Sequence, residues 1–142
     1  MVDKNLILRK ISALDEYLKQ IREYTDLSIK AYTADWKVQR IVERTLQMMI
    51  ETCMDISGHI ISDEKLRIPE TYADMFHILA ENKILHESQL TAFDKMAKFR
   101  NIIVHNYEKI DPEIVLGILK KNLNDFEDFK ATIIDYLKIR KR

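Results

Sequence analysis

Hydrophobic residues recur every three to four positions along most of the chain, the spacing that places side chains on one face of an α-helix. This pattern predicts five helices, over residues 3–29, 36–61, 71–82, 88–104 and 111–137. The first two carry hydrophobic stripes that contain Leu6, Ile7, Leu14, Leu18, Ile21 and Leu27, and Val38, Ile41, Val42, Met49, Cys53, Ile56 and Ile60. Because the connections are short, we expect an all-α, antiparallel bundle. We expect it to form one domain over residues 1–142.

The last predicted helix has the clearest start. Asp111 suits the N-cap, Pro112 the first helical position and Glu113 the positive end of the helix dipole. The stripe expected to face the core contains Ile114, Ile118, Leu119, Leu123, Phe126, Ile133 and Leu137. Gly117 lies inside this helix, where glycine costs up to ~1 kcal/mol relative to alanine. We therefore expect Gly117 to allow the close approach of another helix.

Residues that interrupt helices are rare, since only two of the 142 residues are Gly and two are Pro. Sandwiches and barrels need turns every ~8–12 residues and build them largely from such residues. A fold rich in strands is therefore excluded. Two interruptions remain: residues 32–35, where Thr33 or Asp35 fits a helix cap, and the loop 62–70, which Pro69 closes.

Charge and composition narrow the class of protein. Lys and Arg together number 23, as do Asp and Glu, so no net charge attracts nucleic acid or a membrane surface, and RNA binding would need a local patch. Hydrophobic residues (46%) and charged residues (32%) are balanced as in globular proteins. The single Cys53 fits a reducing cytoplasm. We expect no signal peptide, and the hydrophobic runs are shorter than the ~20 residues of a membrane-spanning helix.

The motifs of common enzyme classes are missing. The sequence has no Gly-rich phosphate loop, no Cys-x-x-Cys pair, no His-Glu-x-x-His and no Gly-x-Ser-x-Gly. Of the four histidines (His59, His77, His86 and His105), only His105 has polar neighbours of catalytic type, namely Arg100, Asn101 and Tyr107. Asn101 shares a helix face with His105, whereas Arg100 lies about 140° away.

The next helix begins at Asp111, so the helix that carries Arg100 must end near His105. The four polar side chains then gather at a helix end. By itself this pattern also fits a purely structural helix end, where a cation stabilises the helix by about 0.3–1 kcal/mol.

The string Arg100-x-x-x-x-His105-x-Tyr107 resembles the signature of the HEPN superfamily, and of its HepT-like toxins in particular. The resemblance covers most of the chain, more faintly in the first and last helices. Further matching segments are Trp36 to Ile61, Pro69-Glu70-Thr71-Tyr72, Phe76-x-Ile78-Leu79, Phe99-Arg100-Asn101 and Glu108-x-Ile110-Asp111. The resemblance implies a HEPN-like bundle and a metal-independent endoribonuclease toxin that cleaves tRNA or mRNA.

The same resemblance implies a role for each site residue. His105 would act as base toward the ribose 2′-hydroxyl or as acid toward the leaving oxygen. Arg100 would hold the scissile phosphate and stabilise charge in the transition state, and Asn101 would orient His105 or the phosphate. Tyr107 would position the phosphate or accept AMP from an MntA-like nucleotidyltransferase antitoxin, and this AMPylation would block the RNA cleft. A homodimer or higher homo-oligomer in which two motifs face one cleft is implied too, without cofactor or metal ion.

Gln47, Glu51, Asp55 and His59 form a polar row along the second helix, at a spacing of four residues. The row is interpreted either as metal-binding or catalytic carboxylates, or as a solvated strip that borders the dimer cleft, and we favour the strip. The resemblance adds a supporting role behind the active site.

Other side chains have simpler interpretations. Methionines, including Met48, Met49 and Met54, are expected in the core or an interface, and Trp36 as an anchor rather than a base-stacking platform. The basic tail 138–142 fits the helix dipole and solubility, or an RNA footprint shared with Lys95, Lys98 and Arg100.

Two other functions stay open: a non-catalytic HEPN partner that binds substrate for a nucleotidyltransferase and accepts AMP, and a helical interaction protein whose motif is structural.

Overall fold

The computed structural model describes residues 2–140, the last two of them as backbone only. This part of the chain contains helices, turns and loops but no strand. The α-helices are α1 (Lys4–Ile21), α2 (Ile29–Ala34), α3 (Trp36–Asp63), α4 (Tyr72–Glu81), α5 (Leu90–His105), α6 (Pro112–Gly117) and α7 (Leu123–Arg140). Short turns cover η1 (Arg22–Tyr24), η2 (Glu87–Gln89), η3 (Tyr107–Lys109) and η4 (Ile118–Asn122). The predicted all-α bundle is confirmed.

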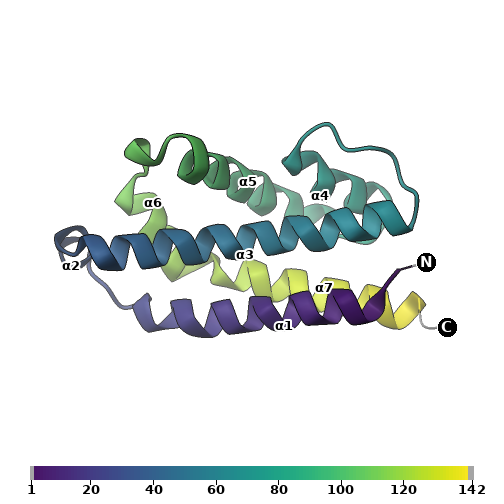
Figure 1. Cartoon of the computed structure of the whole chain (residues 1–142), viewed down its shortest axis with the longest axis horizontal. Helices are drawn as coiled ribbons and strands as arrows, with labels where there is room; N and C mark the ends of the chain where they lie inside the picture. Colours follow the sequence, from purple (N-terminus) through teal and green to yellow (C-terminus); the bar gives the residue numbers. More distant parts are fainter. Residues whose placement is uncertain (1, 141–142) are drawn as a thin grey trace.

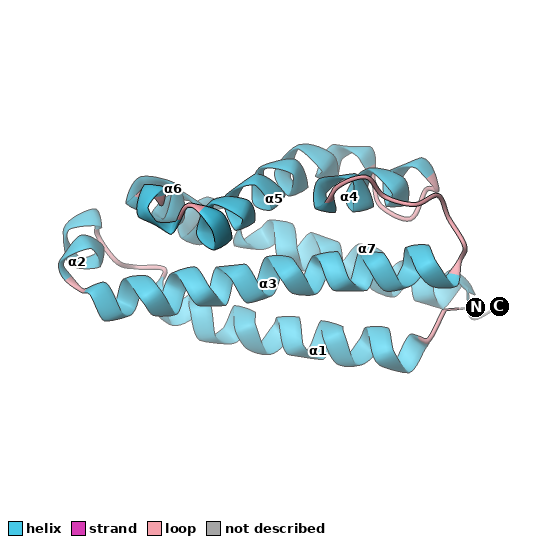
Figure 2. Cartoon of the chain, turned by 45° about the horizontal axis from the view of Figure 1, so that its top comes forward, coloured by secondary structure: helices cyan, strands magenta, loops and turns pink. Residues whose placement is uncertain are grey.

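The long helix α3 is the centre of the bundle and packs against α1, α2, α4 and α5. In Figure 1, α1 runs antiparallel to α3 below it, and α5 runs antiparallel to α3 above it. Figure 2 shows α4, α5 and α6 on one side of α3 and α1 on the other, with a long loop between α3 and α4. Among the described residues, no helix combines the length and the hydrophobicity that crossing a membrane requires.

Three phenylalanines from different helices form an aromatic cluster in the core. The ring centroid of Phe76 on α4 lies 4.7 Å from that of Phe93 on α5, and Phe129 on α7 lies 5.2 Å from Phe93 and 6.3 Å from Phe76. All three side chains are buried. Because offset and edge-on aromatic pairs add about 0.5–1.5 kcal/mol to the burial of their surface, this cluster ties α4, α5 and α7 together.

The predicted hydrophobic stripes are mostly buried, with two exceptions. Ile41 and Ile114, both expected to face the core, are 46% and 50% exposed. Ile41 lies within one helical turn of Lys37 and Arg44, which are also exposed, so it belongs to the outer face of α3.

The predicted helix 3–29 was too long, because α1 ends at Ile21. The Ser28 hydroxyl accepts a hydrogen bond from the N–H of Ala31 (3.1 Å) and caps α2, which occupies most of the expected connection 32–35. Tyr32 anchors this short helix, since its side chain is 1% exposed. Asp35 is the cap of α3 as expected, for it accepts from the N–H of Lys37 at 3.0 Å.

The start of the last predicted helix is confirmed, but its continuity is not. Asp111 accepts a hydrogen bond from the N–H of Glu113 (2.9 Å), and Pro112 is the first residue of α6. A π-helical turn over Ile118–Asn122 then separates α6 from α7. The expected close approach at Gly117 is wrong, because an added Cβ atom there would meet no atom within 4 Å.

A salt-bridge network ties the loop before α4 to that helix. The Arg67 guanidinium donates to both carboxylate oxygens of Asp74 (2.7 and 2.9 Å) and to those of Glu81 (2.7 and 3.0 Å). These hydrogen bonds lower the pKa of Asp74 to about 2 and also lower the pKa of Glu81. The loop and the start of α4, where Tyr72 lies, are thereby held together.

Candidate active site

The helix that carries the predicted motif ends where the sequence predicts. The last residue of α5 is His105, and the N–H of Asn106 closes the helix by donating to the carbonyl of Ile102 (2.8 Å). The turn η3 follows at once and begins with Tyr107. The segment from Arg100 to Tyr107 therefore runs from the interior of α5 into a turn at the edge of the bundle.

The Arg100 guanidinium is held by three neighbours. Its Nε donates to Oε2 of Glu51 on α3 (2.9 Å), and its Nη1 donates to Oδ1 of Asn101 (3.2 Å). Its Cζ atom lies 4.9 Å from the ring centroid of Tyr72, the first residue of α4, within the range of a cation–π interaction. The Arg100 side chain is 14% exposed. Arg100 is thus fixed between α3, α4 and its own helix.

The polar row on α3 is divided between two environments. Gln47 Nε2 donates to the same Oε2 atom of Glu51 at 3.0 Å, so these two residues belong with Arg100. Asp55 instead forms a salt bridge with Lys10 of α1, and its other carboxylate oxygen is 3.6 Å from His59 Nε2. The described residues contain no group of three or more His, Cys, Asp or Glu that could hold a metal ion.

His105, the last residue of α5, and Tyr107, just after it, are both exposed to solvent. Tyr107 is 67% exposed, and His105 is also exposed. Within residues 2–138, the His105 side chain makes no hydrogen bond or ion pair. The structure thus joins Arg100 to Asn101 by a hydrogen bond, and within residues 2–138 no hydrogen bond or ion pair joins the side chain of either residue to that of His105 or Tyr107. Ile103, between them, is buried, whereas Val104 is 37% exposed.

Two cavities adjoin these residues. A groove of about 540 Å³ between α1, α3 and α4 is lined in part by Arg44, Glu51 and Tyr72, so it borders two of the three residues that hold Arg100. A smaller one of about 260 Å³ lies beside Tyr107 and is also lined by Arg40.

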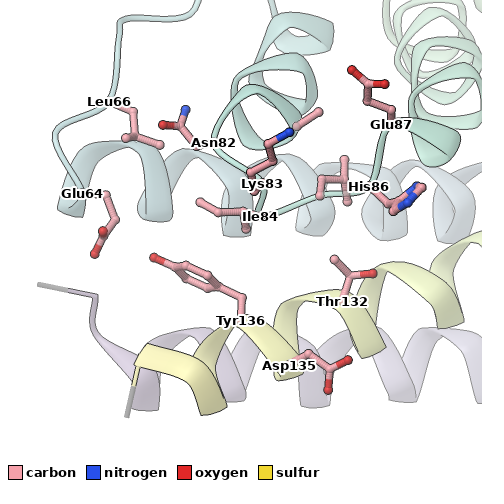
Figure 3. A pocket seen from close by; sticks show the side chains of 12 residues that line it. Glu64, Leu66, Asn82, Lys83, Ile84, His86, Glu87, Thr132, Asp135 and Tyr136 are labelled. Carbon is pink, nitrogen blue, oxygen red and sulfur yellow. The ribbon is translucent and has the colours of Figure 1, made fainter. Parts of the chain in front are cut away.

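A larger groove of about 940 Å³ lies elsewhere and contains none of the predicted site residues. Figure 3 shows Lys83 and His86, from the α4–α5 connection, facing Tyr136 and Thr132 of α7 across it. Burial, and to a lesser degree the negative charge of Asp63, raises the pKa of Tyr136.

The remaining side chains singled out from the sequence fall into three groups. Met49 and Met54 are buried in the core as expected, whereas Met48 is half-buried and lines the 540 Å³ groove. Trp36 is 65% exposed at the start of α3, and its role stays a prediction. The tail interpretation concerns residues 138–142, and from 139 onward their side chains lie outside the described residues.

A family model described as "Ribonuclease HepT-like" matches residues 14–133, which include the whole Arg100–Tyr107 segment. The chain belongs to the HepT-like ribonuclease family. The resemblance drawn from the motif is therefore confirmed, together with the ribonuclease class that it implied.

Two characterised relatives of this HepT-like chain carry nuclease names. The mRNA nuclease HepT of Shewanella oneidensis is 33% identical over 126 residues, covering 88% of this chain and 93% of the relative. The tRNA nuclease HepT of Aphanizomenon flos-aquae is 26% identical over 136 residues, covering 96% and 92%.

A solved structure supports the fold of the HepT-like chain. The tri-AMPylated Shewanella oneidensis HEPN toxin, in complex with MNT antitoxin, has 32% identity and a TM-score of 0.86, and the match covers 94% of this chain and 99% of that one.

Sequence reasoning did not find the contacts that two distant residues make with the Arg100 of this HepT-like chain. Glu51 was a member of the polar row, to which the resemblance gave a supporting role behind the active site, and Tyr72 was only part of the family resemblance. Their contacts with Arg100 span 49 and 28 positions of the chain, so helical spacing contains no signal for them. Only the packing of α4 and α5 on α3 brings Glu51 and Tyr72 to Arg100.

Proposed function

We propose that this chain is a metal-independent endoribonuclease toxin that cleaves tRNA or mRNA in the cytoplasm. The observation that carries the proposal is the Arg100–Tyr107 segment: the family signature lies at the open end of α5, with a held guanidinium and an accessible imidazole. The nuclease relatives support an RNA substrate, and the single buried Cys53 fits a reducing compartment.

In the proposed reaction, the ribose 2′-oxygen attacks the adjacent phosphorus and the 5′-oxygen of the next nucleotide leaves. His105 takes the proton of the 2′-hydroxyl or gives a proton to the leaving 5′-oxygen. Arg100 donates hydrogen bonds to the phosphate oxygens, where negative charge grows in the transition state. Asn101 orients Arg100 by accepting from its Nη1. The products are a 2′,3′-cyclic phosphate and a 5′-hydroxyl.

We propose that two copies of the chain complete this site. One histidine cannot serve as base and acid in the same step, so a second His105 from another copy facing the same cleft supplies the missing proton transfer. Exposed hydrophobic side chains near this end of the bundle support a partner surface there; they are Ile29, Trp36, Ile41, Tyr107 and Ile114.

We propose that an MntA-like nucleotidyltransferase antitoxin neutralises the enzyme by AMPylation of Tyr107. The Tyr107 oxygen attacks the α-phosphorus of ATP, pyrophosphate leaves, and the phenolic proton is released. The attached AMP adds bulk and negative charge beside the RNA site and repels the RNA backbone. The exposure of Tyr107 supports this role, as does the AMPylated state of the Shewanella oneidensis toxin.

We expect the purified protein to cleave RNA in the presence of a metal chelator. A labelled RNA is incubated with the protein in excess EDTA, and the fragments are analysed for cyclic phosphate and 5′-hydroxyl ends. Intact RNA, or cleavage that appears only after a divalent metal is added, would show that the proposed reaction is wrong. If the protein leaves RNA intact but still accepts AMP, the non-catalytic acceptor is the correct function.

We expect AMPylation to disappear in Tyr107→Phe, because the acceptor oxygen is missing. The protein is incubated with ATP and the antitoxin, and its intact mass is measured for the addition of one or more AMP units. Tyr24→Phe, which removes the hydroxyl of a half-buried tyrosine on η1, is the matched control and keeps the labelling. Labelling that persists in Tyr107→Phe would assign the acceptor to another residue.

A further inference from the structure

We propose that Glu51 is a positioning residue, which fixes the guanidinium of Arg100 in the orientation that receives the scissile phosphate. This inference rests on the proposed ribonuclease function. It assigns to one member of the α3 polar row, Glu51, a specific task that neither the motif nor the relatives' names contain. Glu51 is not a catalytic residue in this proposal, because it touches Arg100 rather than the RNA.

The pattern of hydrogen bonds leaves one side of the guanidinium available. An arginine has five N–H groups, and here Glu51 takes the one on Nε while Asn101 takes one on Nη1. Among the described residues, both N–H groups of Nη2 and one of Nη1 have no hydrogen-bond acceptor. Adjacent N–H groups on these two nitrogens match a phosphate in bidentate fashion. The Glu51 contact therefore selects the end of the guanidinium that meets the phosphate.

Glu51 is itself held in place. Gln47, one turn earlier on α3, donates to the Oε2 atom that also accepts from Arg100. The Tyr72 ring covers the guanidinium plane and limits its rotation. A carboxylate, an amide and an aromatic ring thus restrain one partly buried cation, which is the arrangement expected of a group that must not move during a reaction.

Stability alone gives a weak reason for this ion pair. The Glu51 side chain is 36% exposed, and ion pairs that reach solvent contribute little to folding. A carboxylate beside a phosphate-binding cation also weakens the attraction for RNA, because it cancels part of the positive charge. The orientation of Arg100 therefore explains the presence of the Glu51 carboxylate, whereas stronger binding of RNA does not explain it.

The test compares substitutions at Glu51 with a substitution one turn away. We expect Glu51→Ala to lower kcat for RNA cleavage roughly tenfold to hundredfold, since misplacement of a catalytic group by an ångström has effects of this size. We expect KM to stay unchanged or fall, because a negative charge near the RNA is removed. Glu51→Gln, whose carbonyl still accepts from Arg100 Nε, should recover most of kcat. Asp55→Ala, which removes a paired carboxylate on the same helix, should retain the parent's kcat and KM.

Each outcome supports or overturns the assignment. Full kcat in Glu51→Ala overturns it, and so does an equal loss in Glu51→Gln and Glu51→Ala, since the charge itself is then required. If Glu51→Ala loses its helical circular dichroism, Glu51→Leu replaces it and keeps the side-chain volume without the acceptor. If the proposed ribonuclease function is itself wrong, the parent protein and Asp55→Ala also fail to cleave RNA. This outcome differs from a failure of the Glu51 assignment, in which the parent protein and Asp55→Ala cleave RNA normally.

Discussion

Replacing His105 with alanine is expected to lower the rate of RNA cleavage by at least ~100-fold, because general acid–base catalysis contributes about 10²–10⁴-fold. The thermal unfolding midpoint should stay close to that of the parent, since His105 is exposed and its side chain bonds to no other residue between 2 and 138. Arg100→Ala should cause a loss of similar size through the missing charge stabilisation in the transition state. The measurement is initial cleavage rate in a chelator, with thermal melts on the same samples.

His86→Ala serves as the matched control, because His86 is also exposed but lies on the connection between α4 and α5. It should cleave at the parent rate. Mixing and refolding the His105→Ala protein with an excess of the parent, or the reverse, gives a further check on the proposed shared cleft. A mixed dimer has only one intact His105, so its activity should fall toward that of the His105→Ala dimer rather than to half of the parent's. Cleavage at the parent rate by both single variants would contradict the catalytic assignment.

Phe129→Ala is expected to lower the free energy of unfolding by about 3–5 kcal/mol, the usual cost of removing a buried phenylalanine ring. Phe129 contacts the rings of Phe76 and Phe93, so its loss leaves a cavity between α4, α5 and α7. Urea unfolding followed by circular dichroism at fixed protein concentration measures the change. Ile68→Ala is the control, since Ile68 is 87% exposed and its loss should change the unfolding free energy by less than ~0.5 kcal/mol. A Phe129→Ala value as small as that of the control would contradict this account of the core.

Helical periodicity and capping residues predict this fold well where the two signals agree. Asp111 with Pro112, and Asp35 before α3, mark true helix starts because a side-chain oxygen accepts from the first free N–H groups. The predicted helix 3–29 was too long because periodicity and capping residues disagree in this segment. Leu27 continues the periodic pattern beyond the end of α1, but Ser28 caps a new helix, and the buried Tyr32 anchors it.

The candidate site was likewise predicted in part, for the residues that are close together in the sequence. The motif residues Arg100, His105 and Tyr107 are close in sequence, so the sequence predicts their common location at the end of α5. Glu51 and Tyr72 come from distant segments, and their contacts with Arg100 depend on how three helices pack. The roles of all these side chains stay predictions until the variants are assayed.

The salt-bridge network of Arg67 has a consequence for enzyme kinetics. The folded-state pKa of Asp74 is depressed, so the stability that it contributes is present above its unfolded pKa of 3.8 and is lost only as the pH falls toward about 2. Histidine changes charge between about pH 5 and 8, where this network stays ionised. The start of α4, and with it Tyr72 beside Arg100, therefore stays anchored throughout that range. A change in cleavage rate within that range therefore does not come from the release of α4 around the guanidinium.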